Sequence, residues 1–470
     1  MNSAGTIKKK NKYEMDMCNG NLFKKIVVFC LPLMLMGILQ LLYNAADLIV
    51  VSNFSGDDNA LGAVGSTGSL VSLTVNLFMG LSVGTNVICA NLFGAKEHDR
   101  IEKVVHTSIL LSFIIGTILG IFGFIFAGEL LKMMNNNLEL SKVYLKIYFI
   151  GMPFNLVYNF AAAILRAVGD TKRPLYFLTI SGFVNVLLNL LFVIVFKMSV
   201  AGVATATIIS QILSCVLIMI TLMRTKECYK FSFRKLKISK RELIEVIRVG
   251  LPAGIQSSIF SISNALIQSS VNLFGETAMN GNAAAANVEG FVYAAMNSVY
   301  HAALAFTSQN RGAGKSKNIK KVTIYSLIYV TIVASSFGVL LFSVGESVLQ
   351  IYTHNPNEIE VGFIRLHYLC LPYFLCGIMD VMVGVLRGLG KSSVPMAVSI
   401  IGVCGFRVAW ILLFFYNYTD FTNVVDLNML YISYPISWII TFIAHTTCYF
   451  IYSKKIFKEM NMKTVQTLSI

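Results

Sequence analysis

Apolar residues occur along this chain in long uninterrupted blocks that short polar segments separate. About twelve blocks reach roughly 20 residues, the length that a helix rising 1.5 Å per residue needs to cross about 30 Å of hydrocarbon. They cover residues 26–52, 61–92, 104–127, 144–165, 175–196 and 200–223 in the first half, and 247–274, 283–308, 322–345, 363–386, 394–417 and 429–452 in the second. The pattern predicts an all-α integral membrane protein with 12 transmembrane helices.

Short motifs in the first half recur in the second at a nearly constant spacing. Residues 165–169 read LRAVG and residues 386–390 read LRGLG, each at the end of an apolar block. Other matched positions are Pro32 with Pro252, Asn44 with Asn264, Gly94 with Gly312, and Pro153 with Pro372. The offset stays between 218 and 221 residues. The chain is therefore predicted to hold two repeats, which in membrane proteins usually enclose a substrate path at their interface.

Composition and charge place the predicted helices in a membrane and orient them. Hydrophobic residues make up 56% of the chain and charged residues 13%, which is too apolar for a soluble globule. Most of the 38 Lys and Arg residues share one side with the N-terminus, so the positive-inside rule predicts a multi-pass cell-membrane protein with both termini cytoplasmic. This topology explains the net charge of +15, and nucleic acid is not expected as a partner.

The predicted organisation is two pseudo-symmetric six-helix lobes around a central cleft. The expected segments are a cytoplasmic tail at 1–25, a lobe at 26–223, a basic cytoplasmic linker at 224–246, a second lobe at 247–452 and a cytoplasmic tail at 453–470. The linker mixes Lys and Arg with Phe and Leu. This mixture is typical of an interfacial helix on anionic headgroups, but an ordinary positive-inside loop has the same composition.

Asp47 is the only charge well inside a predicted span of the first half. Insertion of a carboxylate near mid-bilayer costs about 2.5 to 3.5 kcal/mol, so such a residue is expected to have a polar partner, a water-filled cavity or a functional role. Asn185 and Asn189 share one helix face, and Thr205 and Thr207 can offer hydroxyl oxygens from the next span. Carboxylate, amide and hydroxyl oxygens suit a hard cation, so these residues form a candidate Na⁺ site; a proton on Asp47 is the other coupling candidate. Alternatively, such polar residues only hold helices together.

Three further charges, Glu289, Asp380 and Arg407, lie inside predicted spans of the second half. Arg407 is expected to pair with Asp380 or Glu289, and if it neutralises Asp380, Glu289 becomes the titrating group. An ion pair used only for packing is the alternative. The first lobe is expected to hold no buried Lys or Arg, which favours cationic substrates. Candidate residues of a substrate cleft are Tyr43, Asn44, Asn159, Gln256, Asn264 and Arg407.

Motifs for ATP use, hydrolysis and metal binding are missing from the sequence. Two GKS tripeptides occur at 314–316 and 390–392, but Gln309 and Val385 stand where a phosphate-binding loop needs its first glycine. The nine cysteines contain no C-x-x-C pair, and they are expected to fill the core. The chain is not expected to be an enzyme or to carry a cofactor, apart from a coupling Na⁺ or H⁺.

The repeats, the isolated Asp47, the Asn185 and Asn189 pair and the sequence LRAVGDTKRP after the fourth span together resemble the multidrug and toxic compound extrusion (MATE) family of bacterial type. The likeness covers about residues 20–455. It implies alternating access of two lobes and export of organic cations driven by sodium or proton entry. It also implies that Asp47 is the coupling carboxylate, with Asn185, Asn189 and Thr207 beside it, and that Asp380 matches the family's acidic position in span ten.

One position departs from the family pattern. The sodium-coupled branch carries an acidic residue in span seven, where this chain has only Gln, Ser and Asn as polar residues. A second-lobe sodium site is therefore in doubt, and Glu289 in span eight is hypothesised to substitute.

The sequence predicts a monomeric, cation-coupled multidrug antiporter of the plasma membrane that exports cationic aromatic molecules, with Tyr and Phe available for cation–π contact. Its other partner is the lipid bilayer. One alternative is a flippase for lipid-linked oligosaccharides or cell-wall precursors in the same superfamily, which would need cationic side chains for a pyrophosphate. A channel or receptor is a third possibility, but matched polar depths in two repeats suit rocking lobes better than a fixed pore.

Overall fold

The computed structural model describes residues 13–54, 60–133 and 139–468, and every regular element within these ranges is helical. The first repeat contains α1 (Leu22–Phe54), α2 (Ala60–Ala95), α3 (His98–Met133), α4 (Glu139–Ile150), α5 (Met152–Ala167), α6 (Lys172–Leu190), the π-helical turn η1 (Leu191–Val195) and α7 (Ser199–Arg224). The linker contains only the short 3₁₀ turn η2 (Phe233–Lys235).

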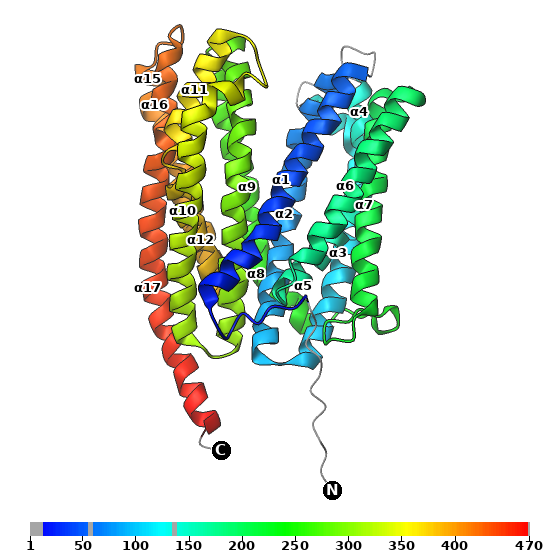
Figure 1. Cartoon of the computed structure of the whole chain (residues 1–470), viewed down its shortest axis with the longest axis vertical. Helices are drawn as coiled ribbons and strands as arrows, with labels where there is room; N and C mark the ends of the chain where they lie inside the picture. The colour runs from blue at the N-terminus through cyan, green and yellow to red at the C-terminus, as the bar shows by residue number, and fades with distance from the viewer. Residues whose placement is uncertain (1–12, 55–59, 134–138, 469–470) are drawn as a thin grey trace.

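The second repeat has the same order of elements, with more interruptions near its end. It contains α8 (Lys240–Asn272), α9 (Glu276–Gly312), α10 (Ser316–Leu349), α11 (Pro356–Cys370), α12 (Tyr373–Gly388), α13 (Ser393–Ser399), η3 (Ile400–Gly405), α14 (Phe406–Trp410), η4 (Ile411–Phe415), α15 (Tyr416–Tyr418), η5 (Val424–Asp426), α16 (Leu427–Tyr431) and α17 (Ser433–Leu468). Figure 1 shows two helical bundles side by side, with the start of α1 and the end of α17 at the same end of the molecule, here called the terminal end.

Most of the expected membrane spans are present. Within the described residues, nine helices are long and apolar enough to cross a bilayer, and the pairs α4–α5 and α11–α12, each bent by 48°, raise the number to 11. Helix α9 is also long enough, at about 55 Å, but it fails on polarity. It packs against α1, α2, α10, α11 and α12, so most of its residues are buried against protein and need not be apolar.

The repeated LRAVG and LRGLG motifs are helix ends. Gly169 follows α5 with a φ of +91°, and Gly390 follows α12 with a φ of +74°. In both repeats the glycine N–H donates to the carbonyl of the arginine three residues before it, and the next N–H donates to the carbonyl of the preceding leucine. This is a Schellman cap, which needs the left-handed residue that glycine adopts without strain. The repeat is therefore a repeat of structure as well as of sequence.

Helices α1 and α8 each cross from one bundle to the other. The first half of α1 packs on α9, where Phe29 meets Phe306 edge-on at 5.5 Å, whereas its second half packs on α6 and α7. In the other repeat, the first half of α8 packs on α2 and α3, and its second half reaches α9, where Gln268 accepts a hydrogen bond from Asn282 at 2.8 Å. Each helix contains a proline, Pro32 or Pro252, before this change of partner.

Glycines bring the two bundles into backbone contact near the terminal end. A Cβ on Gly94 of α2 would lie 2.0 Å from the Gln309 carbonyl oxygen of α9, and one on Gly312 of α9 would lie 1.8 Å from the Asn91 carbonyl oxygen of α2. Gly94 and Gly312 are repeat partners, so this crossing is pseudo-symmetric. Gly80 and Gly84 of α2 meet Gly250 and Gly254 of α8 equally closely.

The segment from Glu14 to Gly20, here called the N-terminal strap, also joins the bundles at the terminal end. Met15 N–H donates to the Val168 carbonyl in the first repeat at 3.4 Å. From the second repeat, the Asn310 and Asn318 amides donate to the carbonyls of Met17 and Cys18 at 2.9 and 2.8 Å. Met17 is fully buried. The strap thus binds both repeats at once.

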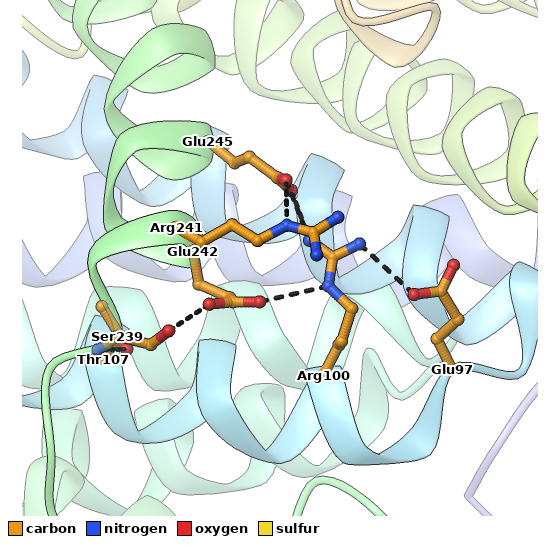
Figure 2. A network of polar contacts seen from close by, with 7 residues as sticks. All are labelled: Glu97, Arg100, Thr107, Ser239, Arg241, Glu242 and Glu245. Atoms are coloured by element: carbon orange, nitrogen blue, oxygen red, sulfur yellow. Dashed lines mark hydrogen bonds and ion pairs between the residues drawn. The ribbon is translucent and has the colours of Figure 1, made fainter.

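An ionic cluster fixes the start of α8 to the first bundle. Arg100 of α3 binds Glu242 and Glu245 of α8 at 3.1 and 2.8 Å, and Ser239 N–H donates to the Thr107 hydroxyl at 3.0 Å (Figure 2). Figure 2 also shows Glu97 and Arg241 at the edge of this network. Five charged side chains converge here: Arg241, Glu242 and Glu245 from α8, Arg100 from α3, and Glu97 from just before α3.

Of the two alternatives for the linker, the structure favours the loop: residues 225–239 hold only the turn η2, and Tyr229 and Phe231 are buried in the first bundle. Helix α17, which contains the last expected span, continues to Leu468, within the segment expected as the second tail. Part of the expected first tail, residues 1–12, lies outside the described residues.

Candidate functional site

The first-repeat polar residues meet as expected around Asp47. The Asn189 amide donates to Asp47 Oδ1, and the Thr207 hydroxyl lies 3.5 Å from Asp47 Oδ2. Asn185 lies 3.5 Å from the Thr207 hydroxyl and 3.4 Å from the Asn189 amide nitrogen. Three helices, α1, α6 and α7, therefore contribute to one polar cluster, here called the Asp47 cluster.

Helix periodicity builds this cluster. Asn185 and Asn189 lie one turn apart on the buried face of α6, 5% and 0% exposed, and Thr207 projects from the facing side of α7. Thr205, which also offers a hydroxyl, instead donates to the Ala201 carbonyl of its own helix at 2.7 Å. Buried Val50, Val51, Val193 and Val203 form an apolar wall nearby. The cluster is a small polar site inside an apolar lobe.

One oxygen of the Asp47 cluster has no hydrogen-bond donor. Asn189 Oδ1 is buried and unpartnered within the described part of the chain, although the nitrogen of the same amide binds Asp47. A buried carbonyl oxygen without a donor costs about 1 to 3 kcal/mol. A cation beside Asp47 would remove this cost, because amide and carboxylate oxygens bind hard cations. The donor set fits Na⁺.

The second-repeat charges are arranged differently from the expectation. Glu289 of α9 binds Arg365 of α11 through its Oε2 atom, at 2.7 and 3.1 Å, and its Oε1 atom accepts a hydrogen bond from the Tyr373 hydroxyl at 2.7 Å. Arg365 also donates to Asn282 at 2.7 Å. The sequence analysis named only Arg407 as a partner for Glu289 and missed Arg365. A basic residue at the start of an apolar span was the signal that could have identified it.

Arg407 pairs with neither carboxylate. Its Nε donates to Ser437 at 3.1 Å, and its guanidinium lies over the rings of Tyr434 and Trp438 at 3.9 and 5.9 Å. Asp380 is half-buried and makes no hydrogen bond or ion pair with any other described residue. Glu289 is therefore paired with an arginine, whereas the charge that acts on Asp380, that of Arg387, lies beyond ion-pair distance.

The remaining expected cleft residues do not form one cluster. Asn44 and Asn264 are exposed, and the half-buried Tyr43 covers Gly182 of α6. Asn159 donates to Asn155 within α5 at 3.0 Å. Gln256 is buried and accepts a hydrogen bond from Arg387 at 2.8 Å. The cleft candidates therefore lie on four different spans, α1, α5, α8 and the interrupted span that contains Arg407, and they have different neighbours.

The expectation that the first lobe holds no buried basic residue is wrong. Arg166, in LRAVG, is 8% exposed, and no described acidic residue lies within 4.0 Å of it. Its Nε has no hydrogen-bond partner in the described chain. Its repeat partner Arg387 is 5% exposed and binds the Tyr300 hydroxyl at 2.6 Å. The same residue at the same place in both repeats was the signal that could have identified the pair.

Known proteins of one kind are similar to this chain. A family model described as MatE matches residues 32–191 and 252–412, so its two matches start 220 residues apart and confirm the repeat. The "Probable multidrug resistance protein YoeA" of Bacillus subtilis is 27% identical over 398 residues, covering 83% of this chain and 86% of that protein. The "Probable multidrug resistance protein NorM" of Thermotoga maritima is 25% identical over 394 residues, covering 81% and 83%.

Solved structures share the fold. One is described as the "outward-facing conformation of a multidrug resistance MATE family transporter of the MOP superfamily"; it has a TM-score of 0.87 and 21% identity, and covers 97% of this chain and 100% of its own. A transporter from Pyrococcus furiosus, whose description cites "reverse polarity of binding pocket", has a TM-score of 0.86 and 21% identity over 95% and 98%.

Proposed function

This chain belongs to the MatE family of multidrug efflux transporters, and we propose that it exports organic cations across the cell membrane in exchange for Na⁺ or H⁺. Family membership confirms the resemblance drawn from the sequence, and with it a multi-pass membrane transporter. The observation that carries the proposed coupling is the Asp47 cluster, in which a carboxylate lies beside a buried amide oxygen that has no donor.

The cluster offers two ways to neutralise the Asp47 charge. Sodium would bind between the carboxylate, Asn189 Oδ1 and the Thr207 hydroxyl oxygen, and a proton would bind to Asp47 itself. Either ion drives transport only if it binds one arrangement of the lobes more tightly than the other. Asp47 lies on the half of α1 that packs on the first bundle, whereas the other half packs on the second. Ion binding at Asp47 therefore acts on a helix that both bundles share.

Charge in the second lobe supports Asp380 as a second acidic partner. Glu289 is held by Arg365, so its negative charge is already balanced, whereas Asp380 has no basic partner within 4.0 Å among the described residues. We assign ion or substrate binding to Asp380 and a structural role to Glu289.

The proposed orientation puts the terminal end in the cytoplasm, as the Lys and Arg distribution predicts. With this orientation, the glycine crossings close the cytoplasmic side. We further propose that the protein acts as a monomer on cationic aromatic molecules, because one chain holds both lobes and the Asp47 cluster carries a negative charge.

Dye efflux tests the proposal. Cells that express wild type, Asp47→Asn or Thr207→Val at matched membrane levels are loaded with ethidium, and efflux is followed with and without external sodium and at two external pH values. Asp99→Asn, which removes an exposed carboxylate at the start of α3, is the matched control. We expect efflux to be lost in Asp47→Asn and kept in Asp99→Asn, and the dependence on sodium or pH identifies the ion. Unchanged efflux in Asp47→Asn contradicts the role given to this residue.

A second candidate function has one observation in its favour. Arg166 is a buried cation without an anion, and a flippase for lipid-linked oligosaccharides or cell-wall precursors needs such groups to bind pyrophosphate. On this account Arg166→Met abolishes flipping of a fluorescent lipid-linked pyrophosphate in proteoliposomes. If wild type transports ethidium but does not flip that lipid, the flippase function is excluded.

A further inference from the structure

A groove runs along the outer face of the second bundle, away from the Asp47 cluster. It has a volume of about 1040 Å³ and lies between α10 and α17, with Met382 of α12 at its base. This volume is at the upper limit of about 300 to 1,000 Å³ that is usual for small-molecule pockets. The groove lies near the terminal end, where α10 begins and α17 extends past the bundle (Figure 1).

The walls of the groove are apolar for most of its length. Ile324 and Leu327 of α10 face Phe442 and Phe450 of α17. Ile324 and Phe450 remain 54% and 58% exposed, so the protein itself does not fill the space. The hydroxyl of Thr446, which also lines the groove, is buried and has no hydrogen-bond partner among the described residues. Such walls suit a hydrocarbon chain.

One end of the groove is strongly basic. Lys320 of α10 and Lys454 and Lys458 of α17 line it, and all three are exposed. No Asp or Glu lines the groove, and none of the three lysines forms an ion pair with another described residue. The Lys320 ammonium lies 5.8 Å from the Phe457 ring centre, at the junction between the apolar walls and the charged end. These charges suit a phosphate.

The spacing between the two ends fits one leaflet of a bilayer. Phe442 and Lys454 are 12 positions apart on the continuous helix α17, or about 18 Å at 1.5 Å per residue. Half of the hydrocarbon thickness is about 15 Å. A lipid whose acyl chain lies against Phe442 therefore places its headgroup at the lysines.

We propose that this groove binds an anionic phospholipid, with an acyl chain between α10 and α17 and the phosphate between Lys320, Lys454 and Lys458. Basic pockets between membrane helices are the usual sites for anionic headgroups. Under the orientation proposed above the lipid comes from the cytoplasmic leaflet, but the site itself does not depend on the proposed transport function.

Native mass spectrometry of the full-length protein with equimolar phosphatidylglycerol and phosphatidylcholine tests this site. Wild type is expected to retain phosphatidylglycerol preferentially. The K454Q/K458Q variant is expected to bind it about 30-fold more weakly, at about fivefold per lysine. The matched control is K321Q/K455Q. It removes one exposed lysine from each of the same two helices, and neither lysine lines the groove. A second variant, Ile324→Trp, fills the apolar part and should reduce retention while all lysines remain.

Four results would overturn the proposal. They are equal retention of both lipids, equal losses in the two lysine variants, unchanged binding in Ile324→Trp, and displacement of the lipid by inorganic phosphate. If the wild type binds the lipid only after the chain is cut beyond Met462, the groove is occupied by the chain's own terminus instead. If the wild type is a dimer, the groove is occupied by a second copy. Unchanged elution and thermal unfolding of each variant establish that it is folded.

Discussion

Replacement of Gly94 by alanine is expected to open the terminal end of the molecule. Gly94 lies where α2 crosses α9, and its new Cβ would be 2.0 Å from the Gln309 carbonyl oxygen. That oxygen belongs to buried backbone and cannot rotate away as a side chain would. The helices must therefore separate by about 1.4 Å before the methyl group reaches ordinary contact at 3.4 Å.

The energetic cost follows from this overlap. An extra methyl group in a closely packed interface costs about 1 to 3 kcal/mol. If the substitution destabilises only the closed arrangement, the ratio of open to closed molecules rises by about 5- to 150-fold, since 1.4 kcal/mol is a factor of ten. Alanine is a better helix former than glycine, so α2 itself is not weakened.

Double electron–electron resonance between spin labels measures the change directly. In a cysteine-free background, labels at Lys103 of α3 and Lys321 of α10, both exposed near the terminal end, report the separation of the bundles. Gly94→Ala is expected to populate a longer distance that wild type lacks. Gly68→Ala is the control on the same helix, because a Cβ there meets nothing within 4 Å. Identical distance distributions for wild type and Gly94→Ala, with full export activity, would refute this account of the closed interface.

Three further predictions test single groups. Asp380→Asn is expected to reduce export without loss of thermal stability, because no ion pair is broken; a folding defect seen by thermal unfolding contradicts this. Glu289→Gln is expected to destabilise the protein by up to about 3 to 5 kcal/mol, because it leaves the Arg365 charge unbalanced. The double variant Glu289→Gln/Arg365→Gln should recover part of this stability in thermal unfolding, and additive losses would contradict a structural role for the pair. Burial raises the pKa of Glu14 from 4.5, whereas the Tyr229 hydrogen bond and the Arg173 charge act to lower it. Because the pKa is higher in the folded protein, the strap is bound most strongly below pH 4.5, and its binding weakens as the pH rises through the raised pKa. Hydrogen exchange of the strap amides should lose this pH dependence in Glu14→Gln.

The sequence predicted the fold class because its two signals are local. Blocks of apolar residues determine where a chain crosses a bilayer, and the LRAVG and LRGLG motifs are helix caps that use only neighbouring residues. The Asp47 cluster was also predictable in part, since Asn185 and Asn189 share a face by periodicity. The contact of that face with α1 came from the family resemblance, and helix periodicity does not specify it.

Other features depend on which helices become neighbours, and a pattern along the chain does not contain that information. Helix α9 is too polar to pass as a span, and more than half of its residues are buried against helices of both repeats. The pairing of Glu289 with Arg365 joins residues 76 positions apart, whereas the Arg407 guanidinium contacts an aromatic ring and no carboxylate among the described residues. Hydropathy along the chain does not indicate that α1 and α8 cross from one bundle to the other. The burial of Arg166 was missed because it lies at the end of a span.

Reverse exchange in proteoliposomes tests the central claim most directly. An imposed ethidium gradient should drive movement of either ²²Na⁺ or protons in the opposite direction in wild-type vesicles, and one of these two fluxes should be absent. In Asp47→Asn vesicles with the same protein content, both ion fluxes should fall to the level of empty vesicles. An ethidium-driven ion flux that persists in Asp47→Asn would show that coupling lies elsewhere and contradict the account.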